Sequence, residues 1–202
     1  MKLYYAPYAC SLAVHIVAIE AEVPLELLKV DLEHGRLEDG RDFRQINPRG
    51  YVPLLELDDG ERLTETAILV EVIADAGANR DLIPYPGTRE RVRIQSWLVF
   101  IATEIHKTFG LLWRDDTPEE TRGIIVARLV DRFAELDSLL QEQPYIAGDR
   151  FTVVDAYAFT VVDWSNHVGI DLAPYPHLRA FQARVAERPA VREAMLSEVA
   201  CN

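Results

Sequence analysis

Cysteine, positive charge and long apolar runs are scarce in this chain, and each shortage excludes a class of protein. Two cysteines, Cys10 and the penultimate Cys201, cannot build a disulfide framework. The 21 Lys and Arg residues are outnumbered by 33 Asp and Glu, and a net charge of −12 argues against nucleic acid as a partner. No uncharged apolar run approaches the roughly 18 residues of a membrane span, and no basic, apolar leader precedes Tyr4. We therefore expect no membrane insertion and a reducing, cytoplasmic location.

The overall composition is that of a folded protein, and the length allows one large domain or two small ones. Of the 202 residues, 49% are apolar and 27% charged. Alternating and helical patterns predict the order β-α-β-loop-β-β-α over the first 77 residues. The predicted strands are 2–5, 25–30, 52–57 and 62–63, the helices are 11–21 and 64–76, and the polar loop is 31–42.

A change of composition after residue 77 predicts a domain boundary. Gly77, Pro84, Pro86 and Gly87 fall within eleven residues, and everything beyond them has helical spacing. We predict an N-terminal domain at 1–77, a linker at 78–87 and an all-helical domain at 88–202. Two capping motifs indicate helix starts, 117–120 with Thr, Pro and Glu and 152–155 with Thr and Asp.

Cys10 lies where the first strand ends and the first helix begins. Unpaired N–H groups and the helix dipole favour a negative charge there, which predicts a lowered thiol pKa and faster alkylation than at Cys201. The alternative is a buried, inert thiol.

Two further features of the N-terminal domain could bind a ligand through the main chain. Pro53 at a strand start leaves the backbone of Val52 free, and a cis Val52–Pro53 bond is a reasonable prediction against the commoner trans form. The segment 64–66, Thr-Glu-Thr, opens a helix with a hydroxyl, a carboxylate and free N–H groups that could hold an α-amino acid. A plain N-cap is the alternative there.

In the helical domain, Thr103, His106 and Lys107 are predicted to share one helix face with Val99. The alternative is a solvated helix end whose cations complement the dipole. The five histidines show no ligand spacing with either cysteine, so we assign no metal.

Several motifs in order resemble those of the bacterial beta-class glutathione S-transferases, over the whole length of the chain. They are YAPYACS at 5–11, NPRGYVP at 47–53, LTET at 63–66, ATEIHK at 102–107 and RFTVVDAY at 150–157. The resemblance implies an α/β, thioredoxin-like N-terminal domain, an all-α C-terminal domain, and a homodimer with sites at the domain and subunit junction.

The resemblance also implies roles for particular residues. Cys10 would face the glutathione sulfur with Ser11 beside it, and the backbone of Val52 before Pro53 would bond the cysteinyl amide. Glu65 and Thr66 would hold the γ-glutamyl end, which suits an anion bound at helix N-termini.

From the helical domain, Thr103 and His106 would close the site, and Lys107 would reach the ligand of the neighbouring subunit. The chain departs from the family pattern at four positions: Tyr8 for Gly, Arg36 for Lys, Tyr51 for Gln and Val99 for Asn.

The predicted function is conjugation of glutathione, as a co-substrate, to small electrophiles, with thiol-disulfide exchange through Cys10 and no cofactor. The second substrate would meet Tyr8, segment 109–113 and Trp164. One alternative is a relative of glutathione-dependent dehalogenases or glutaredoxin-like reductases, although the missing second cysteine at 6–9 disfavours a dithiol mechanism. The other is a noncatalytic transferase-fold scaffold or regulatory module.

Overall fold

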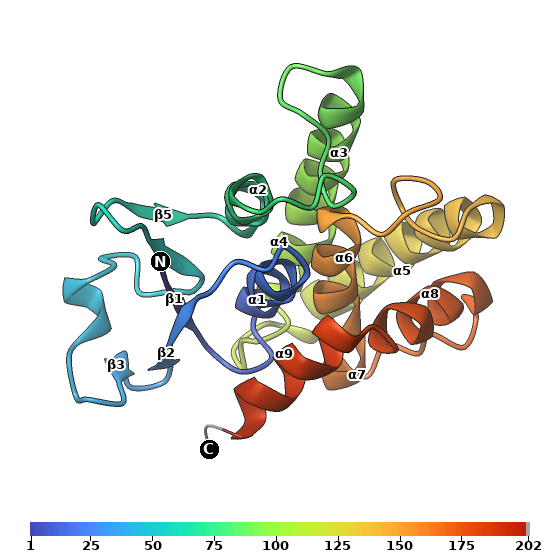
Figure 1. Cartoon of the computed structure of the whole chain (residues 1–202). Helices are drawn as coiled ribbons and strands as arrows, with labels where there is room; N and C mark the ends of the chain where they lie inside the picture. Colours follow the sequence, from blue (N-terminus) through green and yellow to red (C-terminus); the bar gives the residue numbers. More distant parts are fainter. Residues whose placement is uncertain (201–202) are drawn as a thin grey trace. The chain divides into compact units, whose positions relative to one another are not determined.

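The computed structural model describes residues 1–200 and divides the chain into two units (Figure 1). The first unit is Met1–Ile83 together with the residues from Arg188 onward, and the second is Pro84–Glu187. The division after Ile83 falls inside the predicted linker 78–87. The residues from Arg188 onward belong to the first unit, whereas the sequence places them with the second domain.

The first unit contains one mixed sheet of five strands in the order β3-β2-β1-β4-β5. The strands are β1 Lys2–Tyr5, β2 Glu26–Asp31, β3 Arg36–Leu37, β4 Leu54–Glu56 and β5 Arg62–Thr64. Only β1 and β2 pair in parallel, which requires the crossover that the first helix supplies. The predicted strand order along the chain is confirmed, except that the polar loop 31–42 contains the two-residue strand β3, which pairs Val30 with Leu37.

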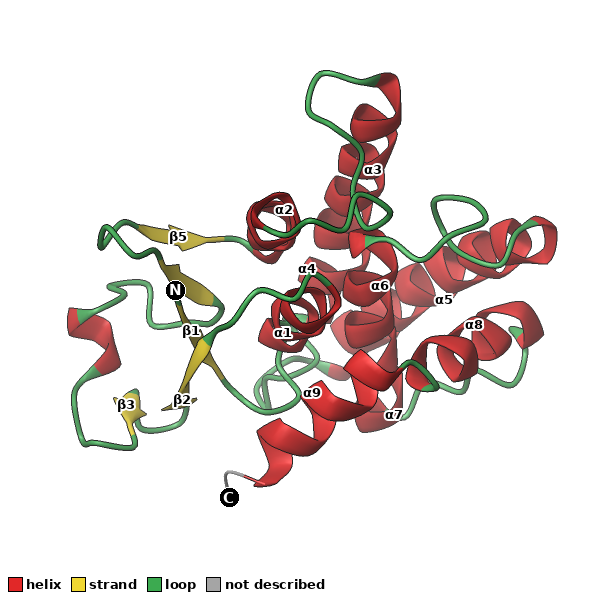
Figure 2. Ribbon diagram, viewed as in Figure 1, coloured by secondary structure: helices red, strands yellow, loops and turns green. Residues whose placement is uncertain are grey.

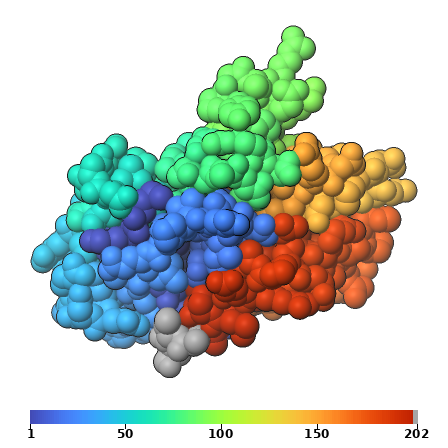
Figure 3. Space-filling model, in the orientation of Figure 1, coloured from blue at the N-terminus to red at the C-terminus, as the bar shows by residue number. Residues whose placement is uncertain are grey.

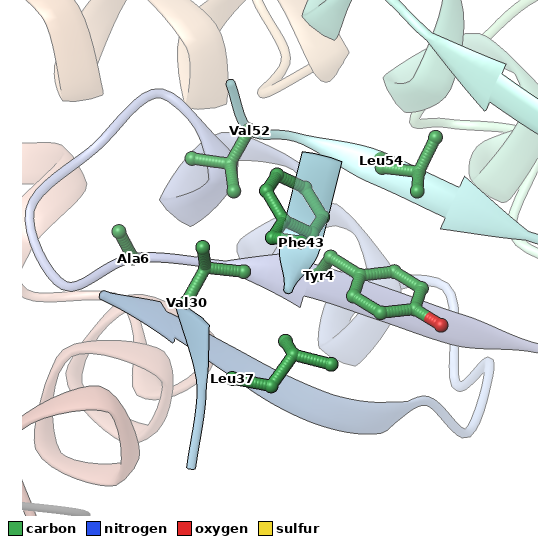
Figure 4. Packing of buried hydrophobic residues seen from close by; sticks show 7 residues of the cluster. All are labelled: Tyr4, Ala6, Val30, Leu37, Phe43, Val52 and Leu54. Carbon is green, nitrogen blue, oxygen red and sulfur yellow. The ribbon is translucent and has the colours of Figure 1, made fainter. Parts of the chain in front are cut away.

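Alternate residues of the strands face opposite sides of the sheet, and both sides are covered. Figure 4 shows one side, where strand residues gather around Phe43 from the short 3₁₀ helix Phe43–Gln45. Leu3, Tyr5 and Leu55, at the alternate positions, are at most 1% exposed. The members of the first cluster are Tyr4, Ala6, Val30, Leu37, Phe43, Val52 and Leu54.

Three helices complete this unit: α1 Ser11–Glu20, α2 Thr66–Ala76 and α9 Pro189–Ala200. The first eight residues of α1 are all buried, as expected for a helix that packs on every side. Gly77, the predicted stop of α2, is needed for close approach, because a Cβ there would lie 2.5 Å from the carbonyl oxygen of Ala21.

Helix α9 is joined to α1 by two polar pairs. Arg188 donates to both carboxylate oxygens of Glu20 at 2.6 and 2.9 Å, and His15 Nδ1 lies 3.2 Å from Oε1 of buried Glu198. Figure 3 shows red C-terminal residues beside the blue N-terminal residues. These contacts explain why the last helix belongs with the sheet.

The second unit is helical, and every strand of the sheet lies in the first unit (Figure 2). Its most buried element is α6, whose first ten residues are all buried. Among residues 1–200, no helix is both long and apolar enough to cross a bilayer. The elements are α3 Arg89–Phe100, a π-helical segment Ile101–His106, α4 Lys107–Phe109, α5 Glu119–Glu142, α6 Val153–Asp163, α7 Ser165–Val168 and α8 Pro176–Ala186.

One of the two predicted capping motifs is confirmed and the other is wrong. The Thr152 hydroxyl and the Asp155 carboxylate form a reciprocal capping box at α6. The Thr117 hydroxyl instead donates to the carbonyl oxygen of Leu111 at 2.6 Å, and Pro118 occupies the N-cap position of α5 without a side-chain cap. Thr117 lies one residue before the N-cap, and its hydroxyl bonds the loop that precedes α5.

Candidate functional site

Cys10 is the N-cap residue of α1, as the sequence predicts, and its side chain is buried, with the residue only 7% exposed. The Sγ–H donates to the carbonyl oxygen of Val52 at 3.5 Å. The Val52–Pro53 peptide bond is cis, which confirms that prediction. The structure thus brings together the predicted sulfur and the predicted main-chain group.

The predicted activation of this thiol is wrong for the free protein. Burial raises the pKa of Cys10 to about 11, and the negative charge of Glu65 acts in the same direction. The Thr66 hydroxyl and the backbone N–H groups of Cys10 and Ser11 lower the pKa, but by less. Desolvation of the thiolate outweighs the helix N-terminus, so the thiol is protonated at neutral pH.

Ser11 lies beside Cys10 but has structural partners. Its buried hydroxyl donates to the carbonyl oxygen of Ala6 at 3.2 Å and accepts from the Ala6 N–H at 3.3 Å. Both bonds close the turn between β1 and α1. This turn also contains Tyr8, which has a φ of 61° in the left-handed region and is 49% exposed.

Glu65 and Thr66 start α2 without forming a plain N-cap. The Glu65 side chain makes no cap hydrogen bond, and its φ of 74° is unusual for a residue other than glycine. Thr66 is buried, and its hydroxyl bonds the Cys10 sulfur. The carboxylate of Glu65 is exposed and therefore open to a ligand.

Arg49 is a residue of this region that sequence reasoning missed. Its Nη1 lies 3.4 Å from Glu65 Oε1, and it donates to the Tyr51 hydroxyl at 3.2 Å and to Thr64 Oγ1 at 3.4 Å. Its position inside the motif NPRGYVP was the sequence signal that could have identified it as a site residue. Arg36, by contrast, donates to the carbonyl oxygen of Gly40 at 3.1 Å within its own loop.

In the second unit, His106 is half-buried against two aromatic side chains. Its Nδ1 lies 2.5 Å from the hydroxyl oxygen of Tyr157, and its ring meets the Trp164 ring edge-on at 4.9 Å between centroids. Burial, and after it the charge of Lys107, lower the pKa of His106 to about 4. His106 is therefore a neutral imidazole at pH 7. Tyr157 was not recognised as its partner, because 51 residues separate the two.

The predicted common face of Val99, Thr103, His106 and Lys107 rests on regular α-helical spacing, which the structure lacks. Ile101–His106 is π-helical, and the Lys107 N–H bonds the carbonyl oxygen of Ala102, five residues back. Thr103 and Lys107 are exposed whereas His106 is half-buried, so the three side chains do not share one environment. Such π segments are frequent at functional sites.

The aromatic residues predicted around a second substrate divide into core and surface. Phe109 is fully buried, Trp164 is 7% exposed, and their rings meet edge-on at 5.6 Å. Trp113 contacts both rings but is 48% exposed, as is Leu111. Trp113 and Leu111, together with Tyr8 in the first unit, are thus side chains of this predicted group that a ligand could reach.

The predicted site residues belong to two separate units. Cys10, Ser11, Val52, Glu65 and Thr66 are contiguous in the first, and Thr103, His106 and Lys107 lie in the second. Cys201 lies outside the described residues. Within residues 1–200, no group of three or more His, Cys, Asp or Glu side chains could hold a metal ion.

Comparison with known proteins identifies both units. Residues 9–76 match the family description "Glutathione S-transferase, N-terminal domain" and residues 100–189 match "Glutathione S-transferase, C-terminal domain". The chain is 42% identical to glutathione S-transferase GstA of Escherichia coli O157:H7, with 98% of each chain covered.

Solved structures agree over almost the full length. A sphingomonad glutathione S-transferase complexed with glutathione has a TM-score of 0.95 at 40% identity, with 98% of each chain covered. A beta-class glutathione S-transferase of Sphingomonas chungbukensis has a TM-score of 0.94, also at 40% identity and 98% coverage of each chain.

Proposed function

Because the chain belongs to the glutathione S-transferase family, we propose that it binds glutathione and transfers its sulfur to small electrophiles. The observation that carries this proposal is the cluster of Cys10, Val52 and Thr66, in which a thiol, a main-chain carbonyl and a helix N-terminus converge. Glutathione is a tripeptide with a thiol, amide groups and a free amino acid end. These groups are complementary to the thiol, the main-chain carbonyl and the helix N-terminus of the cluster. Binding of glutathione by a solved relative supports the same reading.

In the proposed complex, the Val52 main chain pairs with the cysteinyl amide of glutathione. The exposed carboxylate of Glu65 pairs with the γ-glutamyl ammonium, and the N–H groups that begin α2 meet the adjacent carboxylate. Arg49 supplies a further cation for this anionic ligand on a chain of net charge −12. The contributions of Ser11, Pro53, Thr103, His106 and Lys107 stay predictions from the resemblance.

The protonation state of Cys10 favours conjugation over disulfide exchange. In conjugation, the glutathione thiol loses its proton to solvent, its sulfur bonds the electrophilic carbon, and the leaving group departs with the bonding pair. A protonated Cys10 can donate a hydrogen bond to that thiolate. In exchange, Cys10 must itself lose a proton before attacking a disulfide sulfur and releasing a thiolate, which a pKa of about 11 makes slow.

We also propose a homodimer in a reducing, cytoplasmic setting. Val92 and Val99 on α3 are 61% and 58% exposed and, seven residues apart, lie on the same side of the helix. Such an apolar strip suits a second copy of the chain. Light scattering should give a mass near twice 22.9 kDa.

Binding and turnover together test the function against a noncatalytic scaffold. We expect the full chain to be retained on immobilised glutathione, released by free glutathione, and active on a panel of aryl halides, epoxides and activated alkenes. Retention without turnover on any member of the panel would favour a binding module. Absence of retention, with calorimetry also showing no binding, would overturn the proposal.

A further inference from the structure

Arg49 and Glu65 of the first unit form an ion pair in which both side chains keep unused hydrogen-bonding groups. Arg49 Nη1 and Glu65 Oε1 are 3.4 Å apart, and the two side chains are 60% and 62% exposed. Among residues 1–200, Nε and Nη2 of Arg49 and Oε2 of Glu65 have no hydrogen-bond partner. Each side chain can therefore accept a further partner without giving up the other.

Two other arginine–carboxylate pairs of the chain are closed by comparison. Arg188 donates through Nε and Nη2 to both carboxylate oxygens of Glu20, at 2.6 and 2.9 Å. Arg114 donates through the same two nitrogens to both oxygens of Asp116, at 2.9 and 2.7 Å. These two nitrogens form the edge of the guanidinium that matches a carboxylate, and in Arg49 they are free.

The free edge of Arg49 has a defined place, although the side chain is exposed. Asn47, only 4% exposed, accepts the Arg49 N–H at 3.2 Å and donates to the carbonyl oxygen of Tyr51 at 2.7 Å. Arg49 Nη1 also donates to the Tyr51 hydroxyl at 3.2 Å and to Thr64 Oγ1 at 3.4 Å. These contacts hold the guanidinium before a ligand arrives, which lowers the entropy cost of binding.

A cation and an anion that lie side by side, each with a free group, suit a zwitterionic ligand. The γ-glutamyl end of glutathione carries an ammonium and a carboxylate on one carbon. The free edge of Arg49 can donate two N–H bonds to that carboxylate, and the free oxygen of Glu65 can accept from the ammonium. The glycyl end has a carboxylate alone, which Glu65 would repel, so the pair favours the γ-glutamyl end.

We propose that Arg49 is a specificity-determining residue that binds the α-carboxylate of the γ-glutamyl end through Nε and Nη2, beside the ammonium held by Glu65. The inference rests on the proposed function and deepens it by stating which ionic group of the ligand Arg49 recognises. The N–H groups that begin α2 can share this carboxylate, because its two oxygens offer about four acceptor positions. The ion pair between Arg49 and Glu65 is kept in the complex.

The experiment measures by calorimetry the Kd of three reduced ligands: glutathione, its γ-aminobutyryl analogue, which lacks the α-carboxylate, and its glutaryl analogue, which lacks the ammonium. The full-length parent protein is compared with Arg49→Gln and with Arg41→Gln. Arg41 is a matched control, because it is also an exposed arginine of the first unit that pairs with one carboxylate, that of Asp39 at 2.7 Å. Both substitutions remove one positive charge.

We expect Arg49→Gln to raise the Kd for glutathione about three- to tenfold, between the effect of an exposed ion pair and that of a charged hydrogen bond. The glutaryl analogue keeps the carboxylate and should lose affinity by a similar factor. The γ-aminobutyryl analogue should bind the parent and Arg49→Gln equally well. Arg41→Gln should leave all three Kd values unchanged. In steady-state kinetics, Arg49→Gln should raise KM for glutathione with kcat nearly constant.

Two results would overturn the inference. One is equal affinity of the parent and Arg49→Gln for glutathione. The other is a loss of the same size for all three ligands, which would mean that Arg49 acts on the loop or on the overall charge. Should Arg49→Gln not fold, Arg49→Lys replaces it under the same criteria, since lysine lacks the two-nitrogen edge.

The parent protein separates this inference from the proposed function. If the parent fails to bind glutathione, the proposed function fails and the inference falls with it. If the parent binds glutathione but Arg49→Gln shows no loss that depends on the carboxylate, the proposed function stands and the inference alone is refuted.

Discussion

Cys10 in the first unit and His106 in the second are both kept uncharged at pH 7 by burial, but the two units hold them by different means. Cys10 is fixed mainly by main chain, namely a helix start and the Val52 carbonyl, with one side-chain hydroxyl, that of Thr66, in addition. His106 is fixed by the side chains of Tyr157 and Trp164, 51 and 58 residues further along the chain. A site built from main chain tolerates substitution around it, whereas one built from side chains depends on the helices that carry them.

The largest effect, on the free energy of unfolding, should come from removing the carboxylate of Asp155, which caps the start of α6. This helix carries Tyr157. Asp155 accepts the N–H groups of Ile146 and Thr152, both at 2.8 Å, inside the core. Asp155→Ala leaves both donors buried without a partner, and we expect a loss of about 3 to 4 kcal/mol in the free energy of unfolding, measured by urea denaturation. Asp171→Ala, which removes an exposed carboxylate that accepts one N–H, is the control. Equal losses in the two variants would mean that the cap does not anchor α6.

The next effect concerns the thiol of the first unit. In a Cys201→Ser background, alkylation of Cys10 by iodoacetamide at pH 8 should run about a hundredfold slower than alkylation of an exposed thiol with the ordinary pKa of 9.0, because only the thiolate reacts. The rate should rise about tenfold per pH unit and level off near the pKa of about 11. Thr66→Val removes a bond that lowers the pKa and should slow the reaction further. A rate that is already flat between pH 7 and 8 would mean that the thiol is activated after all.

Loss of a single charged contact in the first unit should have an intermediate effect. Glu65→Ala leaves the γ-glutamyl ammonium without its partner, which costs about 1.5 to 3 kcal/mol, or roughly tenfold or more in affinity for glutathione. Glu61→Ala removes another exposed carboxylate, from the β4–β5 hairpin, and should leave the affinity unchanged. If calorimetry finds the same affinity for glutathione in both variants, the γ-glutamyl end does not bind at the start of α2.

The smallest effect is expected at the exposed cation of the second unit. Lys107→Ala should weaken glutathione binding by less than about fivefold, because exposed charge pairs contribute only ~0.2 to 1 kcal/mol. Arg89→Ala removes a positive charge from the exposed start of α3 and controls for the change in net charge. The Lys107 effect should fade as salt is added from about 50 to about 500 mM, whereas a salt-independent loss would indicate a packing role.

Features of the site that depend on neighbouring residues could be predicted from the sequence, whereas features that depend on distant side chains could not. Cys10 at a helix start, the cis bond before Pro53 and a helix that opens within 64–66 are local features, and the structure has all three. The helix begins at Thr66, two residues later than predicted, because Thr64 is the last residue of β5. The thiol pKa was predicted in the wrong direction because burial depends on residues far away in the sequence. The π-helical segment before Lys107 and the Tyr157 contact have no local signal either, since both follow from how helices pack.

The place of α9 has a consequence for synthesis of the chain. The partners of His15 and Glu20 are Glu198 and Arg188, which leave the ribosome after the whole second unit has been made. Domains usually fold in the order in which they emerge. Here the unit that starts first is completed last, so the nascent sheet and α1 must wait for their final helix while the second unit folds. A chain that ends between residues 84 and 187 would contain the N-terminal sheet with an uncovered face on α1, a natural target for a chaperone.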